Sequence, residues 1–324
     1  MIMVHIRIAG RAFINVHSAN AEGAVGNYMA LSKMFILRRT GNGYEISEEP
    51  VISGNMLKHW HAVHMVDLLK SSGYNKICPY CSRHIMYRSP DKNKKDEADF
   101  VKDCAIEDVH GFLQPDVQIR RDSIIKFSFM LPVEETRTEY GAITHNRVVI
   151  EETGKISGDE KAMMVFKREH ASGIYGFSIS GDLLYIGKPL SDPENRNKWL
   201  ALEERKIRVE ATMLALISLL SGRFGAAISR AMPVFRLSEI ILAISKQPIP
   251  NLVHGFYYDY AEESTKILEA ALRSGLTKDL KVFVSGEKPI KIMESEFLSK
   301  ITERVASPIE ALNRGVEVIR DWLS

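Results

Sequence analysis

The clearest helix signal in the chain is Ser53-Gly-Asn-Met-Leu-Lys-His-Trp-His-Ala-Val-His64. Ser53 suits the N-cap position, because its hydroxyl accepts from the free N–H groups of a first helical turn, and nothing from Asn55 to Lys70 breaks a helix. Three apolar residues follow the helical spacing i, i+4, i+7: Met56, Trp60 and Val63. Lys58 and His61 stand three apart on another face. The stretch therefore predicts a packed helix with a basic outer side.

Strands are predicted on both sides of this helix. Residues 2–16 alternate between apolar side chains and a second face that carries His5, Arg7 and Arg11. Thr40-Gly-Asn-Gly-Tyr44 predicts the turn of a hairpin. Further strands are expected at 125–131, 162–167, 174–180, 183–186 and 281–284, and helices at 193–220, 237–246, 258–274, 294–305 and 308–323.

The order of these elements predicts an α+β fold of the ferredoxin-like type with an antiparallel sheet. In that plan the helices cover one face of the sheet and leave the other open. Gly173-Ile-Tyr-Gly-Phe-Ser-Ile179 echoes the RNA-recognition-motif strand, whose aromatics stack on bases. For Tyr175 and Phe177, however, a place in the sheet core is favoured over stacking.

The composition limits the classes of protein to which this chain can belong. The 324 residues are 45% hydrophobic, enough for one large domain or two ordinary ones. No run of about 18 apolar residues occurs, and the alternating N-terminus predicts a strand instead of a signal peptide, so we expect a cytoplasmic protein without a membrane span. The 43 basic and 41 acidic residues leave a net charge of +2, so a polyanion has to be met by a local patch.

Three cysteines raise the question of a metal. An odd count fits a reducing compartment, and Cys78-Pro-Tyr-Cys81 has zinc-knuckle spacing. Cys104, His84 and His110 are candidates for the remaining ligands of a tetrahedral structural zinc. Three reduced thiols within an insertion are the alternative, and the sequence leaves both open.

Other charged residues have ordinary explanations beside functional ones. His61 and His64 are three apart on the predicted helix, but without an HExxH pattern they are expected to be core or surface imidazoles and not metal ligands. Arg120 and Arg121 are as consistent with a solvated turn as with a clamp on phosphate.

Several short blocks occur in one order along nearly the whole chain. Besides the helix stretch, they are His17-Ser-Ala-Asn20 with Gly26-Asn-Tyr28, Asp108-Val-His-Gly-Phe-Leu113, His145-Asn-Arg-Val148, Gly173-Ile-Tyr-Gly-Phe-Ser178, Leu220-Ser-Gly222 with Ser229-Arg-Ala-Met-Pro-Val-Phe235, and Val253-His-Gly-Phe-Tyr257. In these blocks the chain resembles the CRISPR-associated Cas7 family, in its archaeal type I-A branch, the Csa2 or DevR-like group.

The resemblance implies one domain over residues 1–324. It implies a palm built on a modified RNA-recognition fold, a finger-like insertion at 71–110 and a thumb-like hairpin at 133–160. Members of the family polymerise head to tail along a CRISPR RNA within Cascade, beside other Cascade subunits, and present the guide for pairing with target DNA. The resemblance thus implies a backbone subunit that is not an enzyme.

Matching positions imply RNA contacts. These are Asn20, Asn27, Lys33, Lys58, His59, His145, Asn146, Arg147, Arg223, Ser229 and Arg230, to which Arg120 and Arg121 are added from the sequence.

The sequence leaves two other functions open. Type III relatives cut bound RNA with an aspartate of the thumb loop, but Thr136 to Thr153 contains no Asp, which argues against a metal-dependent RNA endonuclease. The second of these functions is that of a stand-alone RNA-binding or zinc-binding regulator.

Overall fold

The computed structural model describes residues 2–25, 28–41, 43–87, 91–146, 149–150, 156–157, 163–226, 228–229 and 231–324. Within these ranges, strand residues 21–25, 143–146, 149–150, 156–157 and 163–166 are described by their backbone only.

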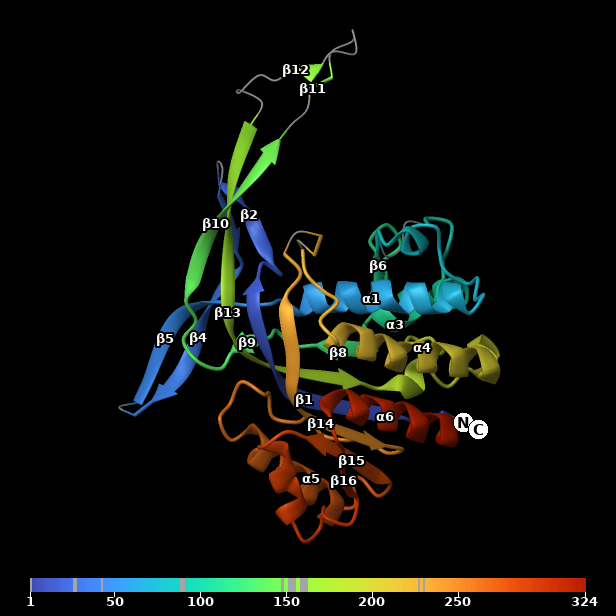
Figure 1. Cartoon of the computed structure of the whole chain (residues 1–324). Helices are drawn as coiled ribbons and strands as arrows, with labels where there is room; N and C mark the ends of the chain where they lie inside the picture. Colours follow the sequence, from blue (N-terminus) through green and yellow to red (C-terminus); the bar gives the residue numbers. More distant parts are fainter. Residues whose placement is uncertain are drawn as a thin grey trace.

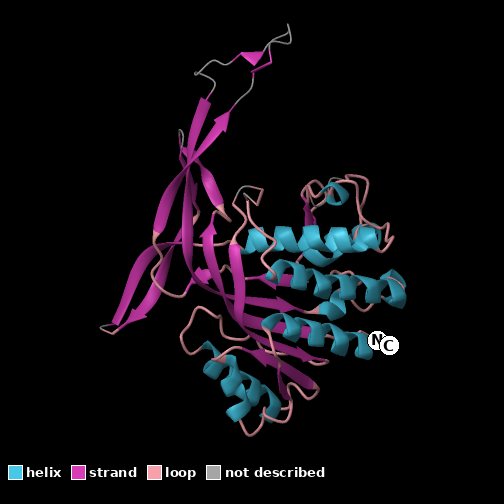
Figure 2. Cartoon of the chain, in the orientation of Figure 1, coloured by secondary structure: helices cyan, strands magenta, loops and turns pink. Residues whose placement is uncertain are grey.

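A mixed sheet with β1 (His5–His17) near its middle runs through the chain (Figure 1, Figure 2). β1 pairs antiparallel with β13 (Met163–Gly181) on one side and with β14 (Val234–Ser245) on the other. Beyond β14 lie β15 (Leu280–Ser285) and β16 (Thr302–Arg304), and beyond β13 lie β3 (Tyr28–Leu31) and β2 (Ala21–Val25). β8 (Ile125–Phe127), β9 (Leu131–Pro132) and β10 (Thr138–Asn146) also pair with β13.

Three helices lie side by side over one face of this sheet: α1 (Gly54–Ser71), α4 (Leu202–Leu220) and α6 (Pro308–Leu323) (Figure 1). The helices pack on the apolar side chains that the alternation of the first strand predicted. Ile6 and Ile8 lie in the same core as Met213 of α4 and Leu312 of α6. The mixed α+β class predicted from the sequence is confirmed.

The opposite face is not open along its whole width. Here α5 (Tyr260–Arg273) and the 3-10 helix η5 (Pro289–Glu294) pack on β14 and β15, and Ala9, Ile241 and Val282 join Leu268 in a second core. The expectation of one free face is therefore wrong for this part of the sheet. The reason is that β14 and β15 carry apolar side chains on both faces.

Several element predictions are confirmed and others are corrected. The helices expected at 258–274 and 308–323 are α5 and α6, and the helix at 55–70 is α1, whose N-cap hydroxyl on Ser53 accepts from the Met56 N–H at 3.2 Å. The stretch 237–246 is strand β14 and not a helix. No helix of the expected length occupies 294–305, which holds turns and β16, and α4 begins at Leu202 instead of 193. The strands expected at 162–167 and 174–180 are one strand, β13.

Two hairpins project from the sheet (Figure 1). β4 (Lys33–Thr40) and β5 (Gly43–Pro50) form the predicted hairpin, closed by the pair Thr40 and Gly43. β10 and the first half of β13 form a longer one, and β11 (Val149–Ile150) pairs with β12 (Ile156–Ser157) beyond it.

The segment between α1 and β8 is built from short elements. It holds the 3-10 turn η1 (Cys81–Arg83), α2 (Glu97–Asp103), α3 (Ala105–His110) and the pair β6 (Phe112–Gln114) and β7 (Ile119–Arg121). Two further 3-10 turns, η3 (Leu183–Tyr185) and η4 (Arg196–Lys198), precede α4. Throughout the described ranges, every helix is too short or too polar to cross a bilayer.

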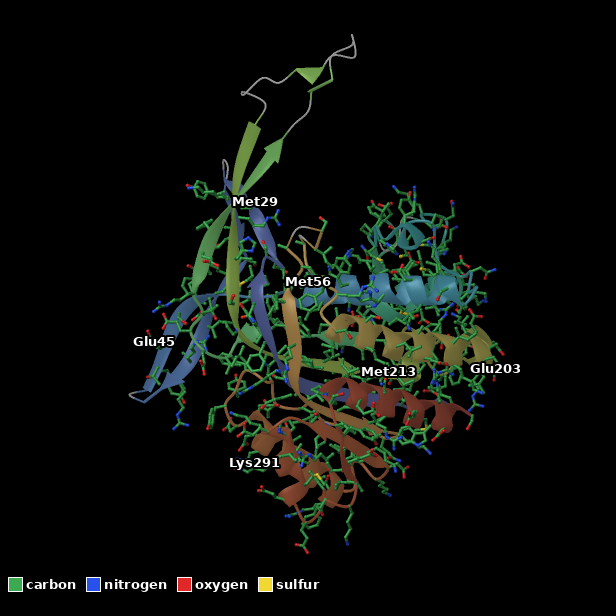
Figure 3. The ribbon with its side chains drawn as sticks, in the orientation of Figure 1. Met29, Glu45, Met56, Glu203, Met213 and Lys291 are labelled. Carbon is green, nitrogen blue, oxygen red and sulfur yellow. The ribbon has the colours of Figure 1, made fainter. Side chains whose placement is uncertain are left out.

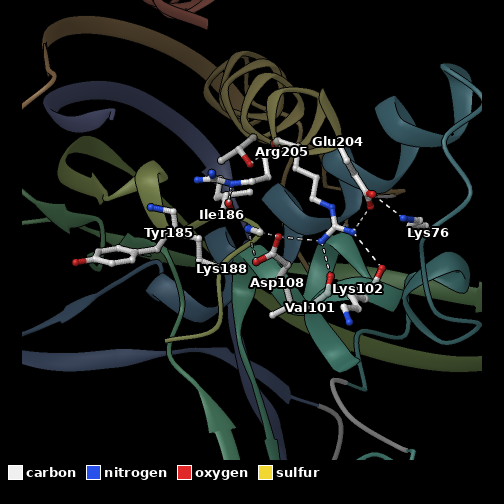
Figure 4. A network of polar contacts seen from close by, with 12 residues as sticks. Lys76, Val101, Lys102, Asp108, Tyr185, Ile186, Lys188, Glu204 and Arg205 are labelled. Atoms are coloured by element: carbon white, nitrogen blue, oxygen red, sulfur yellow. Dashed lines mark hydrogen bonds and ion pairs between the residues drawn. The ribbon is translucent and has the colours of Figure 1, made fainter. Parts of the chain in front are cut away.

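A buried ionic network ties this segment to α4 (Figure 4). Asp108 accepts from Arg121 Nη2 at 2.7 Å and from Arg208 Nη1 at 2.9 Å. Arg121 also donates to Glu97 at 2.5 Å, and Arg208 donates to Glu204 at 2.9 Å. Since Arg121 is only 3% exposed and its guanidinium is bonded within the fold, it is removed from the candidate RNA contacts.

Two buried histidines make stability depend on pH. His61 donates from Nε2 to the Thr212 carbonyl at 2.9 Å and lies 3.0 Å from His110 Nε2 through Nδ1. It is therefore a core residue, and the basic outer face predicted for it is wrong. Burial lowers the pKa of His61 to about 4, and burial with the nearby His170 does the same for His17.

We expect the free energy of unfolding to fall as the pH drops from 6.5 towards 4. Between these pH values the two histidines are protonated in the unfolded chain but stay neutral in the folded chain. Each histidine therefore lowers the free energy of unfolding by up to about 3 kcal/mol. Urea unfolding followed across this range measures the slope, and His61→Gln should reduce it. An equal slope in the variant would contradict the assignment to His61.

Candidate nucleic-acid interface

Three segments that are distant in the sequence meet at the N-terminal end of α1. Asn20, after β1, accepts through Oδ1 from the Ser53 hydroxyl at 2.9 Å. The loop after α4 joins them, because the Ala226 N–H donates to the Ala19 carbonyl at 2.8 Å. Figure 1 shows this loop beside the start of α1, and Figure 3 places Met56 there. The candidate residues Asn20, Lys58, His59, Arg223 and Ser229 thus come from three segments in mutual contact.

Buried bonds and close packing fix these segments. His64 of α1 is 2.7 Å from the Arg223 carbonyl and donates to it through Nε2. Gly222 ends α4 at a φ of +92°, and a Cβ there would lie 2.7 Å from Phe235. Glycine is therefore needed to turn the chain towards α1, with the side chain of Arg223 left exposed.

The start of α1 also abuts β8. A Cβ on Gly54 would lie 2.4 Å from the Phe127 carbonyl oxygen, so only glycine allows this approach. The contact brings Lys58 of α1 and Lys126 of β8 to the lining of one hollow of about 310 Å³. We call this hollow the α1 groove and define it by Ser53, Gly54, Asn55, Lys58, Ser123, Ile125, Lys126, Phe127 and Phe129.

The α1 groove combines donors that suit a phosphate with an aromatic side chain. Two lysines and the positive end of α1 give it positive potential, and Ser53 and Ser123 add hydroxyls. Phe129 is exposed at the rim, where a base could stack on its ring. A second hollow of about 430 Å³ shares Lys58 and Ser123, but there Asp122 offsets Lys58, and Arg121 of its lining is already bonded to Glu97 and Asp108. The positive charge is therefore concentrated in the α1 groove.

Lys33 is already engaged within the fold. Its Nζ lies 2.7 Å from a carboxylate oxygen of Glu169, and the other oxygen accepts from the Leu31 N–H at 2.9 Å. The hydrogen bond to Glu169 raises the pKa of Lys33. Burial by itself would raise the pKa of Glu169, but the bonds from Lys33 and Leu31 lower it. The charge of Lys33 is therefore balanced before any ligand arrives.

The remaining candidates are dispersed. Arg120 is exposed on β7 and pairs in register with Leu113, which lines the second hollow. His145 and Asn146 belong to β10 at the far end of the long hairpin, and only their backbone is described. Asn27, Arg147 and Arg230 lie outside the described residues.

Sequence reasoning missed Lys126 and Phe129. Both were assigned to a strand and neither was selected as a site residue. For Lys126 the available signal was that Lys126 and Ser128 interrupt an apolar run with a period of two, which marks a solvated strand face. This pattern does not mark Phe129, which belongs to the other face of the run.

The three cysteines form a cluster of their own. Their sulfur atoms all lie within 4.8 Å of one another, and all three thiols are free. Hydrogen bonds from Cys104 and Cys81 hold the pKa of Cys78 far below its usual range. His84 is not part of the cluster, since its Nε2 lies 3.0 Å from Asp67 Oδ1 and the residue adopts a left-handed φ of 61° that ends η1. His110 faces His61, so neither histidine takes the place predicted for it.

Comparisons with known proteins agree on one family. The family model described as CRISPR-associated negative auto-regulator DevR/Csa2 matches residues 8–265. A CRISPR-associated protein Cas7/Cst2/DevR of Methanocaldococcus jannaschii is 40% identical over 321 residues, covering 93% of this chain and 99% of the relative. Its counterpart in Thermoproteus tenax is 36% identical over 282 residues, covering 83% of each chain.

More distant similarities extend to assembled complexes. A CRISPR-associated aCascade subunit Cas7/Csa2 of Saccharolobus solfataricus is 26% identical over 326 residues, covering 93% of this chain and 98% of the relative. A chain of a solved CRISPR RNA-guided surveillance complex in a pre-nicking state superposes with a TM-score of 0.52 at 11% identity, covering 97% of this chain and 99% of that one. The structural match shows a shared fold.

Proposed function

The chain belongs to the DevR/Csa2 family of Cas7 CRISPR-associated proteins, and we propose from this that it is a non-catalytic, RNA-binding backbone subunit of a type I-A Cascade complex. In this proposal the sheet with α1, α4 and α6 is a palm of the RNA-recognition type, residues 71–110 are the fingers and 133–160 the thumb. The observation that carries the proposal is the α1 groove together with the meeting of three distant segments next to it, because Ser53 both lines the groove and donates to Asn20.

The chemistry of the groove fits a strand of any sequence. Amines, hydroxyls and helix N–H groups bind phosphate and ribose, and an aromatic ring stacks on any of the four kinds of base. The base edges then stay available for pairing, which a guide RNA needs in order to find its target DNA. Near-neutral total charge is compatible with this, because the positive groups are local.

An exposed apolar face supports the assembly of copies. In the hairpin of β4 and β5, Leu37 stands opposite Ile46, Phe35 opposite Glu48 and Arg39 opposite Tyr44, so these side chains share one face. Phe35 is 76% and Ile46 65% exposed. Apolar side chains gathered on a projecting hairpin are typical of a protein contact, and a head-to-tail contact that does not close produces an open helix of subunits.

Removing the two groove lysines tests the RNA site. We expect Lys58→Ala with Lys126→Ala to weaken binding to two unrelated single-stranded RNAs about equally, and to reduce the salt slope by about 1.4, since each phosphate contact contributes about 0.7. Fluorescence anisotropy at several salt concentrations measures both quantities.

The matched control removes two exposed lysines that lie outside both the α1 groove and the three segments, Lys278→Ala with Lys300→Ala. It should bind both RNAs like the unmodified chain. Loss of affinity for only one of the RNAs, or equal losses in test and control, would overturn the groove as the site.

The nuclease alternative predicts a different result. Incubation of the chain with single-stranded RNA and a divalent metal should leave the RNA intact if the chain is a scaffold. Regularly spaced cuts would favour the endonuclease, and Asp159, the first aspartate after Thr153, would then be the residue to replace; it lies outside the described residues.

A further inference from the structure

The cysteine cluster is built from two separate parts of the chain. Cys78 and Cys81 belong to the turn that leads into η1, and Cys104 lies at the junction of α2 and α3. The backbone brings these parts together, because the Ala105 N–H donates to the Lys76 carbonyl at 3.0 Å. Cys81 and Cys104 are fully buried and Cys78 is half-buried.

The spacing of the sulfur atoms matches a metal better than it matches ordinary packing. Four ligands around zinc at a Zn–S distance of about 2.3 Å stand about 3.8 Å apart. The three sulfur atoms all lie within 4.8 Å of one another, so small shifts place an ion between them. The Cys81 N–H also points at Cys78 Sγ, at 3.5 Å, which stabilises a thiolate at that position.

A carboxylate lies beside one of the three sulfur atoms. Glu107 lies in the first turn of α3, three residues after Cys104, the N-cap residue of that helix. Its Oε1 lies 3.8 Å from Cys78 Sγ, and Glu107 is buried. A hollow of about 760 Å³ is lined by Cys78 and Glu107 and offers an ion a path from the solvent.

We propose that Cys78, Cys81 and Cys104 bind one zinc ion, with Glu107 as the fourth ligand. Thiolates select zinc over the hard cations magnesium and calcium, and a closed set of four protein ligands makes the site structural. The ion would join the turn at 78–81 to α3, the helix that carries Asp108 of the buried network. This inference does not depend on RNA binding.

Metal analysis of the full chain tests the site. We expect one zinc per chain by elemental mass spectrometry after purification and dialysis. Cobalt added to the metal-free chain should give the strong visible and near-ultraviolet absorption of a tetrahedral thiolate site. The cobalt spectrum is read on the unmodified sequence, so it stands even if Cys104→Ser fails to fold.

Single substitutions test the proposed ligands one at a time. Cys104→Ser should lose the zinc, and Glu107→Gln should bind it at least tenfold more weakly. His84→Ala is the matched control and should keep it, since His84 faces Asp67. Chelation should lower the melting temperature of the unmodified chain but not of Cys104→Ser. A chain with no zinc and no cobalt spectrum, or with a disulfide between Cys78 and Cys81, would overturn the proposal.

Discussion

Replacing Asp108 with Asn is expected to lower the free energy of unfolding by about 3–5 kcal/mol, because it leaves buried guanidinium groups without their shared counter-charge. Asp108 is fully buried and receives hydrogen bonds from Arg121, Arg208 and the Gly187 N–H. Asn has the same shape, so the change removes charge without opening a cavity. Urea denaturation of the full chain measures the effect.

A surface ion pair in the same segment provides the control. Asp103 pairs with Lys94 at 2.6 Å, but its side chain is 59% exposed. Because solvent screens such pairs, Asp103→Asn should cost no more than about 1 kcal/mol. Similar losses for the two variants would show that the network around Asp108 does not hold the segment to α4.

The second large effect concerns the assembly of copies. Under the proposed function, Phe35→Glu with Ile46→Lys should reduce cooperative binding to a long RNA more than tenfold, since anchoring apolar side chains contribute about 2 kcal/mol or more each at an interface. Both side chains are largely exposed, so the fold should survive. Sedimentation velocity with long and short RNAs distinguishes assembly from the binding of single copies.

Leu276→Glu is the matched control for assembly. Leu276 is an exposed apolar residue beyond α5, far in sequence from the hairpin. It should assemble like the unmodified chain. If the hairpin variant assembles normally as well, the contact between copies lies on another face.

The sequence correctly predicted those elements whose two faces differ in burial. In α5 and α6 the helical period of the apolar residues separates a buried side from an exposed one. Ile240-Ile-Leu-Ala-Ile244 has no such period, because α6 covers one side of β14 and α5 the other. Periodicity does not separate a doubly buried strand from a buried helix, and this is why β14 was wrongly predicted as helical.

The candidate site was predictable only in part, for a related reason. Asn20 and Arg223 were selected by family resemblance, and the structure joins their segments through the Ala19 carbonyl and the N-cap of α1. Nothing local separates Arg120 from Arg121, yet one is exposed and the other is buried. That difference arises from Glu97 and Asp108, which meet Arg121 only after the chain folds.

The central claim is that many copies of this chain bind one RNA strand without regard to its sequence. The most direct test counts the copies bound, by native mass spectrometry, on two unrelated single-stranded RNAs that are each prepared in a short and a doubled length. We predict intact RNA, the same count on both sequences, and twice as many copies on the doubled strands. One copy at either length would contradict the claim and favour a stand-alone regulator, and a count that follows the sequence would contradict it as well.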